Sequence, residues 1–340
     1  MAERSIVLGF SGGMDSVTSA LRLRDEGWRV VATTLDTVGD EVVIAKARKV
    51  AAEIGVEHRV VDVREEFEKH IISYFRDSYA SGRTPAPCTV CNSAIKWRWL
   101  EHEANSLGIE HIATGHYFKV ERHGGLCYVA RATDSQKDQS YYLWGLKQDT
   151  LRRIVTPMGD VVKSTIKANF ADKRESMGLC FLQGMAYRDF LREHCPATAR
   201  KGEVVDIEGR IVGRHDGVAF YTIGQKRGFE CEMPGVAVVA IDAARNRLVV
   251  GEDALLYKLT LELTGCNIVD KEEFIDSCDV SVVVRGIGRN PEGFIRRVEP
   301  IEGGFRVELE NPAWAPAAGQ PVVFYRQNRV IGGGFVECYG

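Results

Sequence analysis

The chain has 340 residues, of which 45% are hydrophobic and 27% are charged. This length exceeds a single typical core, so two or three domains are expected, and the composition is that of a globular protein rather than a low-complexity one. The formal net charge of −3 gives no general attraction to nucleic acid, so an RNA contact would have to come from local basic patches.

Neither a membrane span nor a targeting segment is predicted. No apolar run approaches the length of a transmembrane helix, and the first residues lack a charged-then-apolar signal pattern. We therefore expect a cytoplasmic protein without a membrane partner. Nine cysteines in a large chain of this kind do not indicate a framework of structural disulfides.

The first part of the chain alternates strands and helices. Apolar residues at 5–10 predict a strand, and the spacing of Val17, Ala20, Leu21 and Leu23 predicts a helix over 14–26. Further along we expect strands at 28–35, 58–63 and 111–114, and helices at 41–54, near 64–80 and at 92–107. This order predicts a parallel sheet covered by helices, with ligands at the carboxyl ends of its strands.

The turn between the first strand and the first helix reads Ser11-Gly12-Gly13-Met14-Asp15-Ser16. Adjacent glycines let successive N–H groups face one anion, and the helix adds the positive end of its dipole. No Gly-Lys-Ser/Thr follows, so the turn is not of the Walker type. It resembles the pyrophosphate loop of enzymes that split ATP into AMP and pyrophosphate. The alternative is a glycine turn that caps an ordinary helix.

The pattern changes after about residue 195. Short apolar runs separated by Gly, Asp and Asn turns predict a small β-rich domain and then a β-barrel or sandwich. We predict a catalytic domain at 1–195, a central β-rich domain at 196–255 and a C-terminal β-barrel domain at 256–340.

Two cysteines lie in settings that suit chemistry. Cys91 follows a proline-stiffened loop and is expected near the start of helix 92–107, where the dipole and Lys96 favour a thiolate. Cys180 follows Gly178 after a basic stretch at 167–174. A lone cysteine is more often a small buried side chain. Two loop cysteines beside a pyrophosphate loop favour redox or sulfur-transfer chemistry.

Basic residues gather in segment 147–174 and suit a track for RNA phosphates, although a solvated helix face is an equal alternative for any one lysine. The basic residues of this segment are Lys147, Arg152, Arg153, Lys163, Lys167, Lys173 and Arg174. In Lys96-Trp97-Arg98-Trp99, the tryptophans could stack on a base, but tryptophans on a helix are more often core residues.

Several separated motifs, taken in order, resemble those of the bacterial and organellar tRNA-specific 2-thiouridylases over nearly the full length. They are Ser11–Ser16, Gly82-Arg83-Thr84-Pro85 with Cys91-Asn92 and Ile95-Lys96, Ala113–Tyr117, Lys137–Tyr141, Gly178–Phe181 and Thr222–Gly228. The resemblance implies a pyrophosphate-loop, HUP-type α/β domain. It also implies an ATP-dependent enzyme that adenylates the C2 oxygen of a wobble uridine in tRNA and replaces that oxygen with sulfur.

The resemblance also implies roles for residues. Cys180 would carry a persulfide, received from a sulfur-donor protein, and Cys91 would be the partner thiol that ends in a Cys91–Cys180 disulfide. The implied ATP contacts are Gly9, Phe10, Ser11, Gly12, Gly13, Met14, Asp15, Ser16, Leu35 and Gly115. The implied tRNA contacts are Ala86, Pro87, Cys88, His116, Lys137, Asp138, Gln139, Arg285, Gly286 and Gln320.

No metal site built from protein ligands alone is predicted. Mg²⁺ would bridge the ATP phosphates, with Asp15 as a direct or water-mediated contact, although Asp15 could instead cap the first helix. A nitrogen-transferring ligase would explain the loop but not Cys91 and Cys180. A zinc-binding or RNA-binding protein using Cys88 and Cys91 lacks the further ligands that structural zinc needs.

The chain departs from its relatives at three places. Ala86-Pro87-Cys88 stands where they commonly have Asn-Pro-Asp, so Cys88 could act as a thiolate, pair with Cys91 or pack. Arg285-Gly286 replaces their usual Arg-Tyr and removes a possible stacking ring. The segment before Cys180 is shorter than in many of them.

Overall fold

The computed structural model describes residues 4–167, 178–286 and 288–340. The chain forms two compact units. The first comprises the chain up to Ile71, Cys88–Met177 and Asn328–Ile331, and the second comprises Ile72–Pro87, Gly178–Gln327 and Gly332–Gly340. The predicted boundaries near 195 and 255 stay a prediction.

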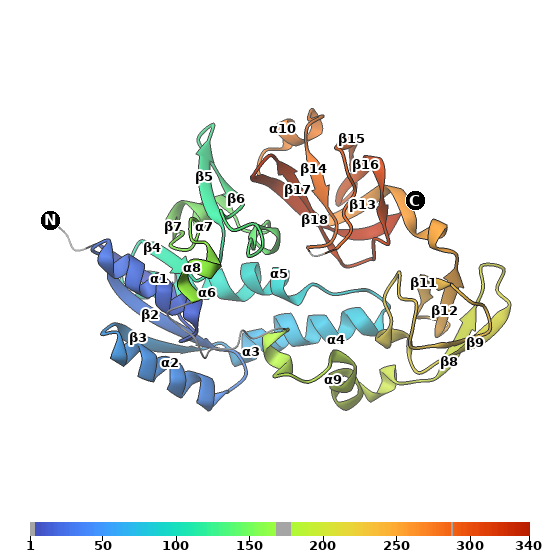
Figure 1. Ribbon diagram of the computed structural model, residues 1–340, viewed down its shortest axis with the longest axis horizontal. Helices are drawn as coiled ribbons and strands as arrows, with labels where there is room; N and C mark the ends of the chain where they lie inside the picture. Colours follow the sequence, from blue (N-terminus) through green and yellow to red (C-terminus); the bar gives the residue numbers. More distant parts are fainter. Residues whose placement is uncertain (1–3, 168–177, 287) are drawn as a thin grey trace. The chain divides into compact units, whose positions relative to one another are not determined.

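The first unit is built on a five-stranded parallel sheet with strand order β3-β2-β1-β4-β7 (Figure 1). Its strands are β1 (Ser5–Gly9), β2 (Arg29–Asp36), β3 (Glu57–Asp62), β4 (His111–Thr114) and β7 (Ile154–Val155). Its helical elements are α1 (Met14–Asp25), α2 (Glu41–Glu53), α3 (Arg64–Phe67), α5 (Pro87–Cys91), η2 (Asn92–Lys96), α6 (Trp97–Ser106), α7 (Gln148–Arg153) and α8 (Lys163–Lys167). A hairpin of β5 (Lys119–His123) and β6 (Leu126–Ala130) is inserted after β4.

Helices cover both faces of the sheet, because successive side chains of its inner strands β1, β2 and β4 are buried on both sides. Ile6 and Leu8 of β1 share a fully buried cluster with Val17, Ala20 and Leu23 of α1. On the other face, a Cβ built on Gly9 would lie 3.2 Å from Leu100 Cδ1 of α6. The predicted doubly covered parallel sheet is therefore confirmed.

One predicted boundary is wrong in a way that affects a site residue. The helix expected from residue 92 begins at Pro87, so helical backbone runs through α5, the π-helical turn η2 and α6. Proline suits a first helical position because its fixed φ is already helical. Its missing N–H does no harm there, since the N–H groups of the first turn have no acceptor within the helix. Cys88, not Cys91, therefore lies next to the helix N-terminus.

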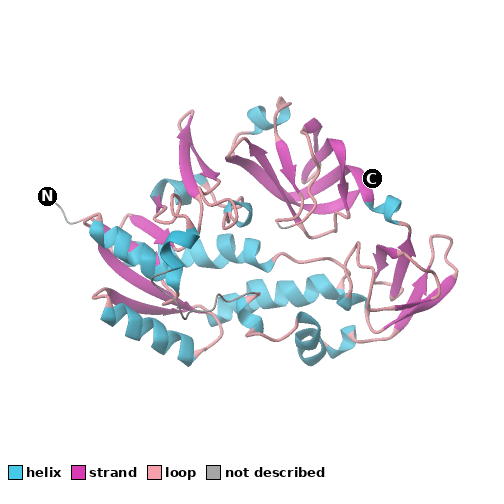
Figure 2. Cartoon of the chain, viewed as in Figure 1, coloured by secondary structure: helices cyan, strands magenta, loops and turns pink. Residues whose placement is uncertain are grey.

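The second unit combines helices with two mainly antiparallel sheets, and Figure 2 shows strands prevailing in it. The smaller sheet has strand order β10-β9-β8-β12-β11, and the larger follows the path β14-β17-β18-β13-β16-β15. Its helices are α4 (Ser73–Ala80), α9 (Tyr187–His194) and α10 (Lys271–Ile275); the π-helical turn η1 (Glu68–Ile72) precedes α4. Its strands are β8 (Gly202–Val205), β9 (Ile211–His215), β10 (Glu230–Cys231), β11 (Ala237–Asp242), β12 (Arg247–Gly251), β13 (Tyr257–Ile268), β14 (Ser281–Val283), β15 (Ile295–Ile301), β16 (Gly304–Trp314), β17 (Pro321–Arg326) and β18 (Arg329–Tyr339).

The β-rich character predicted after residue 195 is confirmed. Within residues 4–167, 178–286 and 288–340, no helix combines the length and apolar character needed to cross a membrane.

Candidate functional site

The predicted phosphate loop lies at the carboxyl edge of the parallel sheet. Gly9 pairs with Thr33 on one side and with Thr114 on the other, so the loops after β1 and β4 leave the sheet side by side. The chain continues from β1 to a strand on one side while β4 lies on the other, and ligands of open α/β sheets bind at such a switch point.

Serine hydroxyls hold the loop in its turn. Ser16 Oγ donates to the carbonyl oxygen of Gly13 at 3.0 Å, and it also accepts from the N–H of Ser11 at 3.3 Å. The N–H of Gly13 donates to Ser11 Oγ at 3.3 Å. These contacts shape the backbone that is predicted to surround a phosphate.

Two glycines are required by close approach. Gly12 has φ +66°, and a Cβ there would lie 2.9 Å from Ala47 Cα of α2. A Cβ on Gly115 would lie 3.0 Å from the backbone nitrogen of Ser16. Gly115 therefore brings the loop after β4 directly against the first turn of α1.

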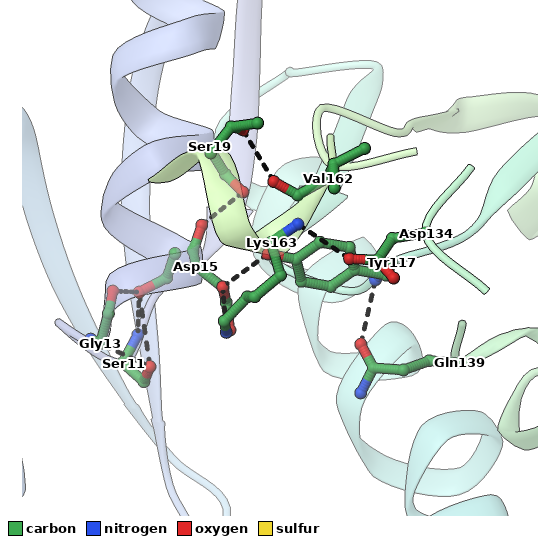
Figure 3. Close-up of polar contacts among 11 residues, drawn as sticks. Ser11, Gly13, Asp15, Ser19, Tyr117, Asp134, Gln139, Val162 and Lys163 are labelled. Atoms are coloured by element: carbon green, nitrogen blue, oxygen red, sulfur yellow. Dashed lines mark hydrogen bonds and ion pairs between the residues drawn. The ribbon is translucent and has the colours of Figure 1, made fainter. Parts of the chain in front are cut away.

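Asp15 is the charged centre of the site, and its partners are drawn in Figure 3. Lys163 Nζ donates to both carboxylate oxygens of Asp15 at 2.7 Å, and the Tyr117 hydroxyl donates to Asp15 Oδ1 at 2.9 Å. Gly13 is the N-cap of α1, and the carboxylate of Asp15 points to this pair of partners. The structure therefore shows Asp15 in the first turn of α1 but not as the cap of this helix.

Lys163, for which the sequence left open a track for RNA phosphates or a solvated helix face, is instead a partner of Asp15. It is the first residue of α8, and its backbone N–H donates to Asp134 Oδ2 at 2.8 Å. Its side chain passes the ring of Tyr117 at 5.5 Å and is 6% exposed. The sequence carries no local signal for this contact, because Lys163 and Asp15 are 148 positions apart.

His116, a predicted tRNA contact, is bonded within the first unit. Its Nδ1 lies 2.7 Å from Thr114 Oγ1, and its Nε2 lies 3.2 Å from Lys96 Nζ. Burial and the Lys96 ammonium hold the pKa of His116 well below its ordinary value. Lysine can only donate, so the neutral ring accepts at Nε2 and carries its proton at Nδ1. His116 is therefore a neutral side chain near neutral pH.

Cys88 and Cys91 lie three positions apart on α5. Cys88 is exposed and Cys91 is half-buried. Positions i and i+3 lie on one helix face, so both thiols belong to the same side of α5.

The residues after Cys91 are held in the core of the first unit. The buried Asn92 side chain donates from Nδ2 to the Tyr142 carbonyl oxygen at 3.2 Å and fixes the turn that follows. Trp97 is 1% exposed, so the core alternative is confirmed for this tryptophan.

Cys180 begins a short 3₁₀ turn, η5 (Cys180–Leu182), in the second unit. The cysteine is exposed, whereas the next side chain, Phe181, packs against Phe75 of α4 and Phe190 of α9 at ring distances of 5.1 and 5.5 Å. The turn is thus anchored through Phe181 and presents Cys180 to solvent.

Two members of the predicted tRNA motif at 137–139 accept hydrogen bonds from backbone N–H groups of the first unit. Asp138 Oδ1 accepts from the N–H of Ala132 at 2.8 Å, and Gln139 Oε1 accepts from the N–H of Tyr117 at 3.0 Å. Gln139 thereby supports the residue that contacts Asp15 (Figure 3). Lys137 is half-buried.

Three predicted tRNA residues of the second unit, Arg285, Gly286 and Gln320, fall into two places. Arg285 donates to the carbonyl oxygens of Ala315 at 2.8 Å and Ile223 at 3.3 Å, beside the exposed Gly286. Gln320 lies in a turn that is joined to the Gly82–Pro85 motif, since the N–H of Thr84 donates to the Ala318 carbonyl oxygen at 2.8 Å. Within the described chain, Gln320 Oε1 is buried with no hydrogen-bond partner.

The basic segment at 147–174 is divided in role. Lys147 is exposed, whereas Arg153 donates to the carbonyl oxygens of Glu110 and Ile109 at 2.7 and 3.1 Å. Lys173 and Arg174 and the side chain of Lys167 lie outside the described residues. Among residues 4–167, 178–286 and 288–340, no group of three or more His, Cys, Asp or Glu side chains could hold a metal ion.

Three family descriptions match successive parts of the chain. Residues 4–184 match the "tRNA methyl transferase HUP domain", residues 188–252 the "tRNA methyl transferase PRC-barrel domain", and residues 272–336 the "aminomethyltransferase beta-barrel domain". The expected order of a HUP-type α/β domain, a small β-rich domain and a β-barrel domain is confirmed.

Full-length relatives give a more specific name than these domain descriptions. The tRNA-specific 2-thiouridylase MnmA 3 of Bacteroides fragilis is 38% identical, over 98% of this chain and 94% of its own length. Proteins named tRNA-specific 2-thiouridylase from Desulfitobacterium hafniense and Clostridium acetobutylicum are 34% and 31% identical over 98% of this chain, which spans 98% and 100% of their lengths. The chain therefore belongs to the tRNA-specific 2-thiouridylase family.

Proposed function

We propose that this protein is a tRNA-uridine 2-sulfurtransferase that uses ATP to replace the C2 oxygen of a wobble uridine with sulfur. The observation that carries the proposal is the full-length similarity to proteins named tRNA-specific 2-thiouridylases, at 38% identity in the Bacteroides protein. Because tRNA is found in the cytoplasm, we expect the enzyme to act there.

The first step would be adenylation. The uridine C2 oxygen attacks the α-phosphorus of ATP, the bond to the β-phosphate breaks, and pyrophosphate leaves. This step turns a poor leaving group into AMP. The Ser11–Ser16 loop, at the switch point of the sheet, offers backbone N–H groups and the start of α1 to the phosphates. Leu35 at the end of β2 and Gly115 after β4 flank the same edge.

Mg²⁺ suits this site as a companion of the substrate. A magnesium ion usually takes one or two carboxylates together with substrate phosphates, and Asp15 supplies a carboxylate that is 34% exposed. Asp15 would hold the ion directly or through water, and the ion would neutralise phosphate charge when bound.

The second step would be sulfur transfer. The terminal sulfur of a Cys180 persulfide attacks C2, and AMP leaves with the original oxygen. The Cys91 thiolate then attacks Cys180 Sγ, the S–S bond breaks, and the terminal sulfur stays on C2. A dithiol reductant would cleave the resulting Cys91–Cys180 disulfide, and a persulfide-carrying donor protein would reload Cys180. The exposure of Cys180 on an anchored turn supports a role in receiving sulfur.

The proposed tRNA surface includes Ala86, Pro87, Cys88, His116, Lys137–Gln139, Arg285, Gly286 and Gln320. Support is strongest at Gln320. Its buried side-chain oxygen has no hydrogen-bond donor within the described structure, and a nucleotide could supply that donor. Cys88 replaces an acidic residue of the relatives, so this chain has no carboxylate at that position.

The proposal is tested with Cys180→Ser. Wild-type protein, unmodified tRNA, ATP and a cysteine desulfurase with cysteine should yield 2-thiouridine, detected as retarded tRNA on a mercury-containing gel. Cys180→Ser should yield none while still binding ATP. Cys195→Ser, at a half-buried cysteine of the same unit, is the matched control and should retain the activity. Full thiolation by Cys180→Ser would refute the persulfide role, and no thiolation by the wild type would refute the function.

A further inference from the structure

We propose that Lys163 is the protein's own cation for the pyrophosphate part of ATP, held in place by Asp15 and Tyr117. This inference deepens the proposed function, because it names the residue that binds the leaving group of the adenylation step.

The phosphate loop itself carries no positive charge. Residues 9–16 contain no Lys or Arg, and their one charged side chain is the acidic Asp15. Backbone N–H groups and the dipole of α1 provide partial charges, but a triphosphate brings several full negative charges next to a carboxylate. A cation from another part of the chain is required at this end of α1 unless a metal ion supplies the whole of it.

Lys163 is the cation that the structure brings there. Its Nζ lies 2.7 Å from each carboxylate oxygen of Asp15, in the first turn of the helix that follows the loop. Figure 3 shows Ser11, Gly13 and the Asp15–Lys163 pair at the same end of α1. The ammonium therefore lies at the same end of α1 as the predicted phosphate loop.

The lysine is held rigidly, which distinguishes it from a surface cation. Its backbone N–H donates to Asp134 Oδ2, and its Nζ lies over the ring of Tyr117, 5.5 Å from the ring centroid. Tyr117, Met158 and Val161 form a buried apolar cluster at the start of α8. A side chain fixed in this way loses little conformational entropy when a ligand binds.

The pair is open on one side. The Asp15 side chain is 34% exposed, whereas that of Lys163 is 6% exposed, so a ligand would reach this pair past Asp15. Phosphate oxygens arriving there would share the ammonium with Asp15. Asp15 would then orient the lysine, while Lys163 would neutralise negative charge on the pyrophosphate as it departs.

The competing interpretation is that Lys163 merely balances the charge of Asp15. Binding measurements separate the two interpretations without any thiolation assay. Isothermal titration calorimetry in EDTA, with pyrophosphate, ATP and AMP as three separate ligands, removes any metal contribution. Lys163→Met should weaken pyrophosphate and ATP binding about 10- to 100-fold, as expected for one charge-assisted contact, and should change AMP binding by less than about 3-fold.

Three further variants sharpen the test. Lys119→Met is the matched control, because Lys119 forms an ion pair with Asp160 at 2.6 Å and not with Asp15. This variant should leave all three affinities unchanged. Lys163→Arg should keep part of the pyrophosphate affinity. The double variant Asp15→Asn/Lys163→Met restores charge balance, yet should still bind pyrophosphate at least about 10-fold more weakly than the wild type.

Recovery of wild-type pyrophosphate affinity in the double variant would overturn the proposal, as would an equal loss of AMP and pyrophosphate binding in Lys163→Met. These outcomes are distinct from failure of the proposed function. If the wild type thiolates tRNA but Lys163→Met binds pyrophosphate normally, the inference alone is wrong. If the wild type does not thiolate tRNA but pyrophosphate binding depends on Lys163, the nucleotide site stands without the function.

Discussion

Single residues constrain the nucleotide site most tightly where backbone conformation and packing coincide, and Gly12 is the best example. Its left-handed φ of +66° and its close approach to Ala47 each disfavour a residue with a Cβ at this position. A left-handed conformation alone costs a residue with a Cβ about 1–2 kcal/mol. The contact with the α2 backbone adds to that cost, because backbone cannot move aside as a flexible side chain can.

Gly12→Ala should therefore destabilise the protein more than Gly55→Ala does. Gly55 has a similar φ of +69°, but no atom lies within 4 Å of a Cβ built there. Gly55→Ala should cost about 1–2 kcal/mol and leave ATP binding intact. Urea unfolding and ATP titration of both variants provide the measurement, and equal losses would show that the contact with Ala47 is unimportant.

His116 gives the folded state a dependence on pH. Its pKa is depressed in the folded protein, chiefly by burial and then by Lys96, whereas the unfolded chain protonates near the ordinary value of about 6.5. Below that pH the unfolded state binds a proton that the folded state does not. Stability is therefore retained above about pH 7 and falls with decreasing pH, by up to about 1.4 kcal/mol per pH unit from this residue.

His116→Asn should flatten that decline between pH 7 and pH 5. The free energy of unfolding, measured in urea at several pH values, is compared with that of His123→Asn, a change at an exposed histidine of β5. An unchanged slope in His116→Asn would mean that this ring takes up a proton in the folded state.

At the scale of elements, the helical stretch through α5, η2 and α6 determines which cysteine faces which environment. The helix begins at Pro87, one residue before the exposed Cys88, and a π-helical turn follows Cys91 directly. Single π-helical turns occur often at functional sites, because they shift the side chains that follow relative to the rest of the helix. The start of the helix favours negative charge at Cys88, while Cys91 is more enclosed.

Cys91→Ser should abolish repeated turnover of tRNA thiolation, while Cys88→Ser should reduce it less. The reason is that Cys91, and not Cys88, is the proposed partner thiol of Cys180. Multiple-turnover assays with dithiothreitol as reductant measure both variants. Equal or reversed effects would place the partner thiol at Cys88.

At the scale of the whole molecule, a net charge of −3 means that tRNA attraction depends on where the cations lie. The structure separates exposed cations from those that hold the fold. Lys147 is exposed, while the guanidinium of Arg153 is bonded to backbone carbonyls ahead of β4.

Lys147→Ala should lower the slope of log affinity against log salt for tRNA by about 1, with little change in stability. Arg153→Ala should instead lower the melting temperature, because two backbone carbonyl oxygens lose their donor. Filter binding at several salt concentrations, with thermal melts of both variants, checks this division. A slope unchanged by Lys147→Ala would remove this residue from the RNA surface.

The sequence by itself determined the alternation of strands and helices, the phosphate loop, the β-rich second part and the family. Those features follow from local rules: apolar periodicity, glycine at turns and motifs read in order. Local patterns also predict a helix start at residue 92, whereas the helix begins at Pro87, whose fixed φ suits a first helical position.

Only the tertiary structure decided that Lys163 forms an ion pair with Asp15 of the predicted phosphate loop. The reason is that the contact joins the start of α8 to the first turn of α1 across 148 positions, through the parallel order of β1 and β4 and the close approach at Gly115. Local patterns specify which elements form, whereas packing between distant elements decides which charged side chains meet.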